Sequence, residues 1–294
     1  MALTEAALAA DLCALGIAAG DLIILHSSYK SLGAPCEDGA RTLLAALTSV
    51  LTESGTLLLP CFTHPADTVH ALTSPCRLGY IPETFRALPS VLVSNSATHR
   101  VAARGPLAAR LTGAHEGRPP LGRGSPFHEA ARLGAKVLML GCDYTACGLI
   151  HVAEDLARLP FACAQIACEG YDRTITLVRT DGRAVQCPPL DSPGDSAAFG
   201  KVEAHLLRHG LLRQGAVAAA RCTLARGNDI LCAALDLLAE DSLALLCASE
   251  SCSVCARRRR FALLVKVKNF VQKRFVQVAG AGGAAGGGSK KASD

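Results

Sequence analysis

The stretch LIILHSSYKSLG, residues 22–33, changes character part-way along its length. Its first four residues are all aliphatic, which is typical of a strand buried on both faces of a parallel sheet. The next eight are mostly small or polar and include three serines and a glycine. Hydroxyls and free backbone donors in such a loop can bind a phosphate or a carboxylate. The stretch therefore predicts a buried strand that ends in an anion-binding loop.

Strands and helices alternate from the start of the chain to residue 159. This alternation predicts a layered α/β/α domain with a largely parallel central sheet. Ligands of such sheets lie beyond the carboxyl ends of the strands, so residues 26–33 mark the predicted ligand edge. We expect helices between 4 and 16 and over 39–51, 82–85, 106–111, 126–133 and 149–159, and strands over 22–25, 56–59, 91–93 and 136–140.

A β-rich segment follows from residue 161. Strands are expected over 163–168, 173–179 and 183–187, and the last two are joined by the tight-turn pair Asp181-Gly182. We assign residues 161–192 to a β-rich insertion within a single domain that spans residues 1–255. After the insertion we expect a helix over 197–209, a strand over 216–223 and a helix over 229–238.

Composition indicates a globular protein of the cytoplasm. Half of the 294 residues are hydrophobic, which is ample for a large core. The first residues lack the basic region of a secretory signal, and no apolar run reaches the ~18 residues of a membrane span. The 14 cysteines are scattered, and many lie in apolar runs, as is typical of reduced thiols in a reducing compartment.

Charge is divided unevenly along the chain. Residues 256–294 hold ten basic residues and one acid, which leaves 20 basic and 24 acidic residues in 1–255, a net charge of −4. An acidic body disfavours a nucleic-acid partner and permits a cationic ligand. Residues 256–278 are expected to form a basic, solvated extension. The Gly/Ala-rich residues 279–294 are expected to form a disordered tail.

Several short blocks form a pattern when they are taken in order. They are HSS at 26–28 with SLG at 31–33, PCFT at 60–63, GYIPETFR at 79–86, TH at 98–99 with VAARG at 101–105, SPF at 125–127 and HVAE at 151–154. Together they resemble the aminoglycoside 3-N-acetyltransferase family of antibiotic acetyltransferases. The resemblance spans roughly residues 3–255, and the blocks at 79–86 and 151–154 are its most specific parts.

The resemblance implies a fold, a co-substrate and an acceptor. The fold would be that of the antibiotic acetyltransferases, the co-substrate acetyl-coenzyme A, and the acceptor a small-molecule amine such as an amino group of an aminoglycoside. Coenzyme A would bind along the HSS loop and the TH block. The residues that the resemblance assigns to coenzyme binding are Ser27, Ser28, Ser31, Leu32, Gly33, His99, Val101 and Gly105.

Acetyl transfer to an amine needs a base, because only the neutral amine is nucleophilic. Histidine titrates in the right range, and His151 is the candidate. Glu154 lies three residues further on, hence on the same helical face, where it can orient the imidazole or hold a cationic sugar. The resemblance implies a further acid from the β-rich insertion, and Asp191 is the nearest match.

Two other interpretations stay open at this point. Residues 93–101 (VSNSATHRV) and 147–150 (CGLI) depart from the family pattern. The chain could thus be a relative that binds coenzyme A without turnover, or a non-enzymatic binding module with a basic tail. A homodimer is also left open.

The C-terminal cysteines raise the question of a metal. Cys252 and Cys255 have a two-residue metal-ligand spacing, with Cys247 nearby, but no second matching pair is present. The sequence therefore predicts no metal site.

Overall fold

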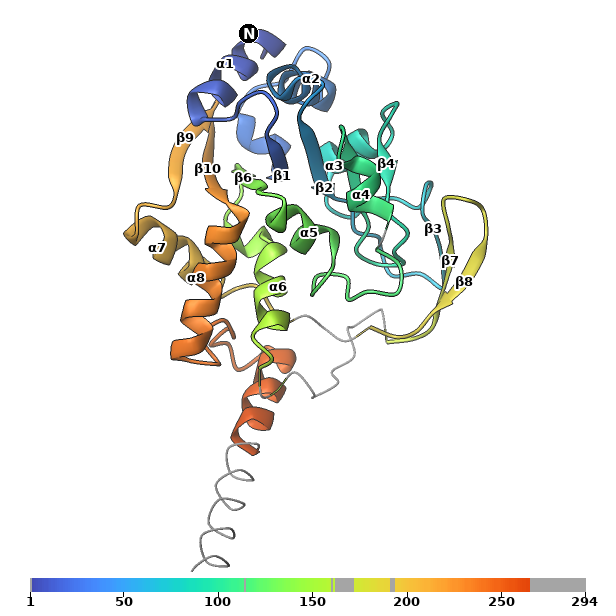
Figure 1. The fold of residues 1–294 in the computed structure, drawn as a ribbon, viewed down its shortest axis with the longest axis vertical. Coiled ribbons are helices and arrows are strands. Elements are labelled where there is room, and N and C mark those ends of the chain that lie inside the picture. Colours follow the sequence, from blue (N-terminus) through green and yellow to red (C-terminus); the bar gives the residue numbers. More distant parts are fainter. Residues whose placement is uncertain (1, 114, 160, 162–171, 191–193, 265–294) are drawn as a thin grey trace, which may run out of the picture.

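A seven-stranded sheet forms the centre of the molecule (Figure 1). The computed structural model describes residues 2–113, 115–159, 161, 172–190 and 194–264. Pairing of β1 with β2 and β6 is parallel, and the four outer pairings are antiparallel, so five of the seven strands run in one direction. In spatial order the strands are β4 (Leu92–Val93), β5 (Val101–Arg104), β2 (Thr56–Pro60), β1 (Leu22–Ser27), β6 (Lys136–Leu140), β10 (Ala220–Arg226) and β9 (Arg213–Val217).

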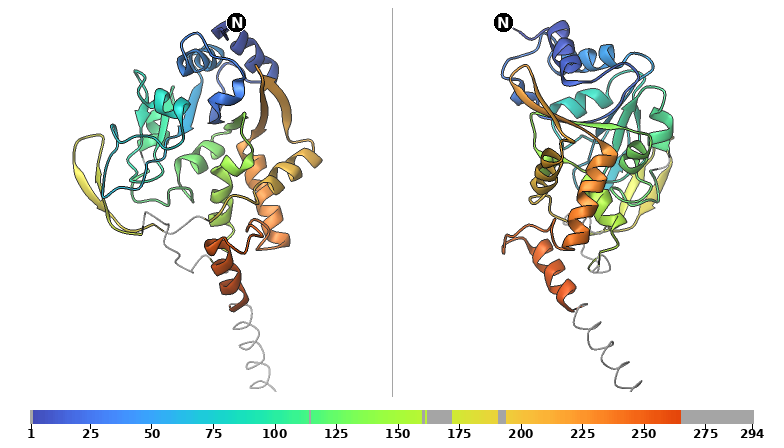
Figure 2. Two further views of the ribbon diagram at one scale, coloured as in Figure 1. Left: turned by 180° about the vertical axis from the view of Figure 1, so that it is seen from behind. Right: turned by 60° about the vertical axis from the view of Figure 1, so that its left-hand side comes forward.

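Helices cover both faces of this sheet. Helices α1, α2 and α3 share one hydrophobic cluster with the sheet, and α4 to α8 share another with its opposite face. The views in Figure 2 show the two helical layers with the sheet between them. The helices are α1 (Glu5–Leu15), α2 (Ala40–Leu51), α3 (Tyr80–Arg86), α4 (Ala108–Gly113), α5 (Pro126–Arg132), α6 (Leu149–Leu156), α7 (Gly200–Arg208) and α8 (Gly227–Glu240), with 3-10 turns at Tyr29–Leu32 and Tyr144–Ala146.

Strand β1 shows why the sheet is buried on both sides. Successive side chains of a strand point to opposite faces. Ile23 and Leu25 accordingly pack with α1 and α2, whereas Leu22 and Ile24 pack in the other cluster. The prediction of a layered α/β/α domain, with most strands of the sheet running one way, is confirmed.

The β-rich insertion forms a second, smaller sheet. Strands β7 (Ile175–Val178) and β8 (Ala184–Cys187) pair as the predicted hairpin, and β3 (Thr68–His70) adds to β7 in parallel. These strands stand to one side of the main sheet in Figure 1 and have a small core of their own. The strand expected over 163–168 lies outside the described residues.

Two expectations about strands were wrong. The segment expected as one strand over 216–223 is a hairpin of β9 and β10, turned at Ala218. The usual turn residues are absent there, and the turn is held by Asp11, whose Oδ2 accepts from the Ala218 N–H at 2.8 Å. Residues 101–104, not expected as a strand, form β5 antiparallel to β2. Small alanines and a length of four residues gave no strand signal.

The end of the chain also differs from expectation. Residues 253–264 form one helix, so the boundary placed at 255 falls inside an element. Its residues Cys255 and Ala262 are buried in the core cluster, and Arg258 is only 9% exposed. One face of this helix therefore packs on the domain, whereas Leu263 and Leu264 are exposed. Residues 265–278 and the tail 279–294 lie outside the described residues.

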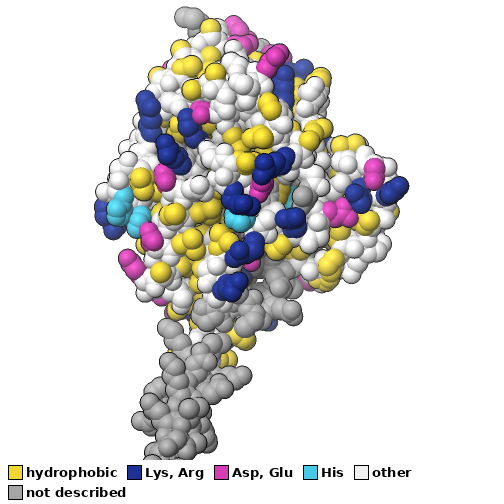
Figure 3. All heavy atoms as spheres, in the orientation of Figure 1, with side chains coloured by type: hydrophobic (Ala, Val, Ile, Leu, Met, Phe, Trp, Pro, Cys, Tyr) yellow, Lys and Arg dark blue, Asp and Glu magenta, His cyan; other side chains and the backbone are white. Residues whose placement is uncertain are grey.

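The surface mixes charges of both signs. On the face shown in Figure 3, basic side chains gather over α5 and α6. There Glu129 forms ion pairs with Arg110 and Arg132. Among the described helices, none combines the length and the apolar character that a bilayer crossing needs.

Candidate active site

The carboxyl ends of three central strands meet at one edge of the sheet. Strand β1 ends there at Ser27, β2 at Pro60 and β6 at Leu140. Because β5 runs antiparallel to β2 and pairs Val101 with Pro60, its first residue lies at this same edge. His99, two residues earlier in the chain, is thereby brought close to the end of β2.

The loop after β1 is tied to the end of β6. The N–H of Ser28 donates to the Leu140 carbonyl at 2.9 Å, and the Ser31 hydroxyl donates to the Gly141 carbonyl at 2.9 Å. Gly141 has a φ of 66°, and a Cβ there would lie 2.3 Å from the Cβ of Ser31. Only glycine permits this approach. The hydroxyls of Ser31 and Ser28 are also bonded to each other at 3.0 Å.

A cavity of about 390 Å³ opens at this edge. We call it the sheet-edge cavity. Its walls come from the ends of β1 and β2, the segment before α3 and the start of α6. The residues that line it are Leu25, His26, Ser27, Pro60, Phe62, Arg77, Leu78, Pro82, His99, Leu121, Cys142, Thr145, Ala146, Cys147, Gly148, His151, Gly194 and Ser196.

The polar groups of the sheet-edge cavity suit an anion. Arg77 is exposed and is the one lysine or arginine in its described lining. Gly148, the residue that precedes α6, also lines it, so the positive end of that helix faces the cavity. The buried Ser27 hydroxyl has no hydrogen-bond partner among the described residues. An orphaned donor at this place favours a ligand, because an unmet polar group is costly to bury.

A second cavity, of about 380 Å³, adjoins the first and is here called the helix-side cavity. Three charged side chains line it, namely Glu154, Asp155 and Arg258. Its remaining walls are mostly apolar. They comprise His99, Pro119, Pro120, Leu121, Gly122, His151, Leu159, Phe161, Pro189 and Leu190.

His151 belongs to the walls of both cavities. It lies in the first turn of α6, its side chain is 10% exposed, and its ring makes an edge contact with Phe199 at 4.8 Å. Its Nδ1 lies 2.6 Å from Oε2 of Glu154. With the carboxylate ionised and the ring neutral, Glu154 can only accept, so Nδ1 carries the proton and Nε2 keeps a lone pair. This is the arrangement of an oriented general base.

Glu154 offers a second oxygen as well. Its side chain is buried at 6% exposure, and Oε1 has no hydrogen-bond partner among the described residues. A buried carboxylate with one bonded and one open oxygen can orient His151 and receive a cation at once. The structure thus brings together His151 and Glu154 as the sequence predicted.

His99 is the other histidine common to both cavities, and its chemistry differs. Burial chiefly, and the positive charge of Arg77 to a smaller extent, lower the pKa of His99 to about 3. Its Nδ1 is 2.8 Å from the Thr98 hydroxyl, and its ring meets Phe62 edge-on at 4.5 Å. His99 is therefore neutral at ordinary pH and forms a wall between the cavities.

Four residues assigned to coenzyme binding are not brought to either cavity. The side chains of Leu32 and Val101 are buried in the two core clusters. Gly33 ends the 3-10 turn and packs against Ala219, where a Cβ would lie 2.7 Å from the Ala219 Cβ. Gly105 follows the far end of β5, at the opposite edge of the sheet, where a Cβ would lie 2.2 Å from the Gly55 carbonyl oxygen.

Of the other assigned residues, Ser27 and His99 line the sheet-edge cavity, and Ser28 and Ser31 build the adjoining loop. Asp191 lies outside the described residues. Its neighbours Pro189 and Leu190 line the helix-side cavity.

Sequence reasoning missed Arg77, Asp155 and Arg258. Arg77 stands two residues before the GYIPETFR block and Asp155 directly follows HVAE, so both lay beside recognised motifs. Arg258 gave no such signal. It reaches the cavity only through the packing of the helix 253–264, where its guanidinium lies over the Phe161 ring at 5.6 Å.

Arg100 belongs to the segment 93–101, which departs from the family pattern, and its role is structural. Its side chain is fully buried and donates to backbone carbonyls of the 70–75 loop, among them Ala71 at 2.5 Å and Ser74 at 2.6 Å. It lines neither cavity. This arginine therefore fixes a loop and does not alter the chemistry of the site.

In this structure a carboxylate orients a histidine at the junction of two cavities, on the carboxyl edge of an α/β sheet. This arrangement is typical of one class of protein, an enzyme that transfers a group between two substrates. Comparison with known proteins gives the family. The chain belongs to the aminoglycoside 3-N-acetyltransferase family, whose model matches residues 24–239.

Relatives of known name are similar over most of the chain. Aminoglycoside N(3)-acetyltransferase IV of Salmonella sp is 31% identical over 246 residues, which cover 82% of this chain and 90% of that protein. Aminoglycoside N(3)-acetyltransferase III of Salmonella sp is 30% identical over 257 residues, covering 77% and 88% of the two chains.

Solved structures give the same answer. The apoenzyme of aminoglycoside acetyltransferase AAC(3)-IVa superposes with a TM-score of 0.78 at 30% identity, over 88% of this chain and 98% of that one. A histidine-to-alanine variant of that protein was solved in complex with a gentamicin and superposes with a TM-score of 0.77. AAC-IIIb in binary complex with CoASH superposes with a TM-score of 0.71 at 26% identity, over 82% and 97%.

These findings confirm the resemblance, the fold class and the enzyme class predicted from the sequence. The chain is an acyltransferase of a family whose co-substrate is acetyl-coenzyme A. The comparisons give no support to the two alternatives, a coenzyme-binding relative without turnover and a non-enzymatic module.

Proposed function

We propose that this protein acetylates an amino group of an aminoglycoside, with His151 as the general base. One observation carries the proposal: His151 forms part of two adjoining cavities whose charged groups suit opposite ligands. Acetyl-coenzyme A, held in the sheet-edge cavity, supplies the acetyl group as a thioester. The amine acceptor occupies the helix-side cavity.

The residues of the sheet-edge cavity fit the coenzyme. Arg77, the start of α6 and the Ser27 hydroxyl are groups that bind phosphate or amide oxygens. Ser28 and Ser31 shape the adjoining loop through their mutual hydrogen bond.

On the other side, Glu154 and Asp155 supply negative charge for a cationic amine. His151 Nε2 removes the proton from the acceptor ammonium, and the nitrogen lone pair forms the new bond to the acetyl carbon as the bond to sulfur breaks. The coenzyme A thiolate that leaves takes up the proton that the acetylated nitrogen gives up. The negative charge of Glu154 stabilises the imidazolium that results. We retain Asp191 as a further acid of this site on the grounds of the family pattern.

The proposal includes the cytoplasm as the place of action. Acetyl-coenzyme A is an intracellular metabolite, and the twelve cysteines of the described part are free thiols. Assembly as a homodimer stays a prediction.

A thiol-release assay tests the proposed function. Purified protein is mixed with acetyl-coenzyme A, a thiol reagent and a panel of aminoglycosides, and release is measured with and without the acceptor. We expect acceptor-dependent release that falls by about 10²–10⁴-fold in His151→Gln, the usual contribution of a positioned base. Coenzyme binding, measured by calorimetry, should be preserved.

The exposed His64 offers a matched control, and His64→Gln should keep the full rate. Coenzyme binding without release for any acceptor would overturn the enzymatic proposal. Full activity in His151→Gln would overturn the assignment of the base.

A further inference from the structure

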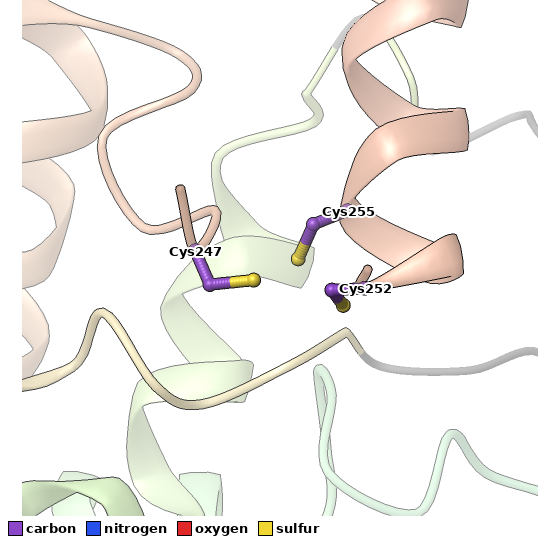
Figure 4. Close-up of side chains that lie close together, drawn as sticks. All are labelled: Cys247, Cys252 and Cys255. Carbon is purple, nitrogen blue, oxygen red and sulfur yellow. The ribbon is translucent and has the colours of Figure 1, made fainter. Parts of the chain in front are cut away.

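Three cysteine thiols meet beside the helix 253–264. Cys255 lies in the first turn of this helix, Cys252 directly precedes the helix, and Cys247 lies in the loop after α8. Their Sγ atoms all lie within 4.8 Å of one another. Figure 4 shows the three side chains converging from these two segments. Four-coordinate zinc with Zn–S bonds of about 2.3 Å holds its thiolates about 3.8 Å apart, so this cluster is compatible with one ion.

A carboxylate stands next to the thiols. Oδ2 of Asp195 lies 3.8 Å from the Cys252 Sγ. The other oxygen, Oδ1, accepts a hydrogen bond from the Ala197 N–H at 2.7 Å, which fixes the carboxylate plane. Metal ligands are commonly oriented by such outer hydrogen bonds. The three clustered sulfurs supply three ligands, and the Asp195 oxygen beside Cys252 is the candidate for the fourth ligand of a tetrahedral site.

We propose that Cys247, Cys252, Cys255 and Asp195 bind one zinc ion as a structural site. Thiolates favour zinc over the hard cations, and four protein ligands leave no open position for catalysis. Cys247 and Cys255 are buried, which suits a closed site. From the sequence we predicted no metal site, because a second cysteine pair with metal-ligand spacing is absent. In the structure the third thiol and the carboxylate come from separate segments of the chain instead.

The zinc site would cross-link parts of both cavity walls. Gly194 and Ser196, on either side of Asp195, line the sheet-edge cavity. Arg258, one turn after Cys255, lines the helix-side cavity. Next to it, Arg259 donates to the carbonyls of Cys247 and Ser249 and so fastens the loop to the helix. The metal would thus position the segments that carry these residues, away from the reacting atoms.

Metal analysis of the intact chain tests the proposal without any measurement of activity. The protein is purified without a metal-affinity tag, dialysed against metal-free buffer and analysed by mass spectrometry for zinc content. We expect about one zinc per chain. Replacement of zinc by Co²⁺ in the wild type should give the thiolate-to-cobalt charge-transfer absorption of a sulfur-rich tetrahedral site.

Variants then locate the ligands. Cys252 is only partly buried, so Cys252→Ser is the least disruptive change, and it should lose most of the bound zinc. Asp195→Ala should bind zinc more weakly than the wild type. The exposed Cys13 and Cys232 provide a matched control, and the double variant Cys13→Ser/Cys232→Ser should retain the full zinc content.

Several results would overturn the site. These are a wild type without stoichiometric zinc, zinc retained in Cys252→Ser, or a wild-type mass two hydrogens short, which would indicate a disulfide among the three thiols. Unchanged zinc affinity in Asp195→Ala would remove Asp195 from the ligand set. None of these results bears on the proposed acetyl transfer, which is measured separately.

Discussion

The two cavities that share His151 are built in different ways. The sheet-edge cavity takes its walls from strand ends and from the segments directly attached to them. The helix-side cavity collects its walls from residues 119–122, α6, Phe161, residues 189–190 and Arg258, which are distant in the sequence. A strand end is fixed by the whole sheet, whereas such a composite wall depends on loop and helix packing. The geometry of the sheet-edge cavity therefore depends on the sheet, and the geometry of the helix-side cavity on how its loops and helices pack.

Replacement of Glu154 is the strongest test of the difference between the two cavities, because Glu154 lines only the helix-side cavity yet orients the base. In Glu154→Gln the side chain keeps its shape and an acceptor oxygen but loses the charge that stabilises the imidazolium. We expect kcat to fall by about 10–100-fold, equivalent to roughly 1.4–2.7 kcal/mol, with the KM for acetyl-coenzyme A unchanged. Steady-state kinetics with both substrates varied measures this.

The control for this variant is Glu53→Gln, at an exposed site. Glu154→Asp should recover part of the lost rate if the carboxylate itself is required. A rise in the KM for the coenzyme of the same size as the fall in kcat would show that Glu154 acts on the sheet-edge cavity instead.

The pH dependence of stability tests whether His99 is buried in the wall between the two cavities. Its pKa is about 3 in the folded state, chiefly through burial, against 6.5 for an unperturbed histidine. Between these values the unfolded chain binds a proton that the folded chain does not, so stability falls as the pH drops below about 6.5. At pH 5 the loss from this one residue is of the order of 2 kcal/mol.

Denaturant unfolding between pH 7 and pH 5 measures the effect. His99→Asn should lose less stability over this range than the wild type, whereas the exposed-site variant His64→Asn should behave as the wild type. His26 and His115, whose pKa values burial also lowers to about 4, keep part of the acid sensitivity in every variant. An unchanged pH slope in His99→Asn would mean that this ring is solvated.

The comparison also separates what the sequence could predict from what it could not. The sheet edge followed from local signals, since the aliphatic run at 22–25 and the serines after it belong to one strand and its loop. Gly33 and Gly105 lie at tight backbone approaches away from both cavities, and a motif alone does not tell a residue that contacts a ligand from one that a tight turn requires.

For the helix-side cavity, the sequence contains almost no local signal of this kind. Arg258 reaches it through a helix that charge composition alone had assigned to a solvated extension. Similarly, the β9–β10 hairpin depends on a hydrogen bond from the Ala218 N–H to Asp11, which is 207 residues away in sequence. Both contacts are long-range, and a local pattern cannot reveal them.

Arg77 tests the coenzyme side alone. It is the cation of the sheet-edge cavity, and Arg77→Ala should raise the KM for acetyl-coenzyme A about tenfold, or roughly 1.4 kcal/mol, while kcat and the KM for the acceptor stay within about twofold. Calorimetric titration with coenzyme A should show the same loss. Arg41→Ala, at an exposed site on α2, is the control. Equal weakening of both substrates would show that the cavities do not divide the substrates as proposed.

Asp155 gives the smallest and most selective test, on the acceptor side. It is exposed, and its Oδ2 accepts from the Arg123 N–H at 2.7 Å, a hydrogen bond that Asn can keep. Asp155→Asn therefore removes a charge with little change of structure. We expect the KM for a cationic acceptor to rise about threefold, because an exposed charge contributes less than about 1 kcal/mol. The difference should shrink in high salt, where exposed charges are screened, and should be absent for acetyl-coenzyme A.

The exposed-site variant Asp38→Asn should show neither effect. A threefold change that persists in high salt would assign Asp155 to the shape of the helix-side cavity, and not to its charge.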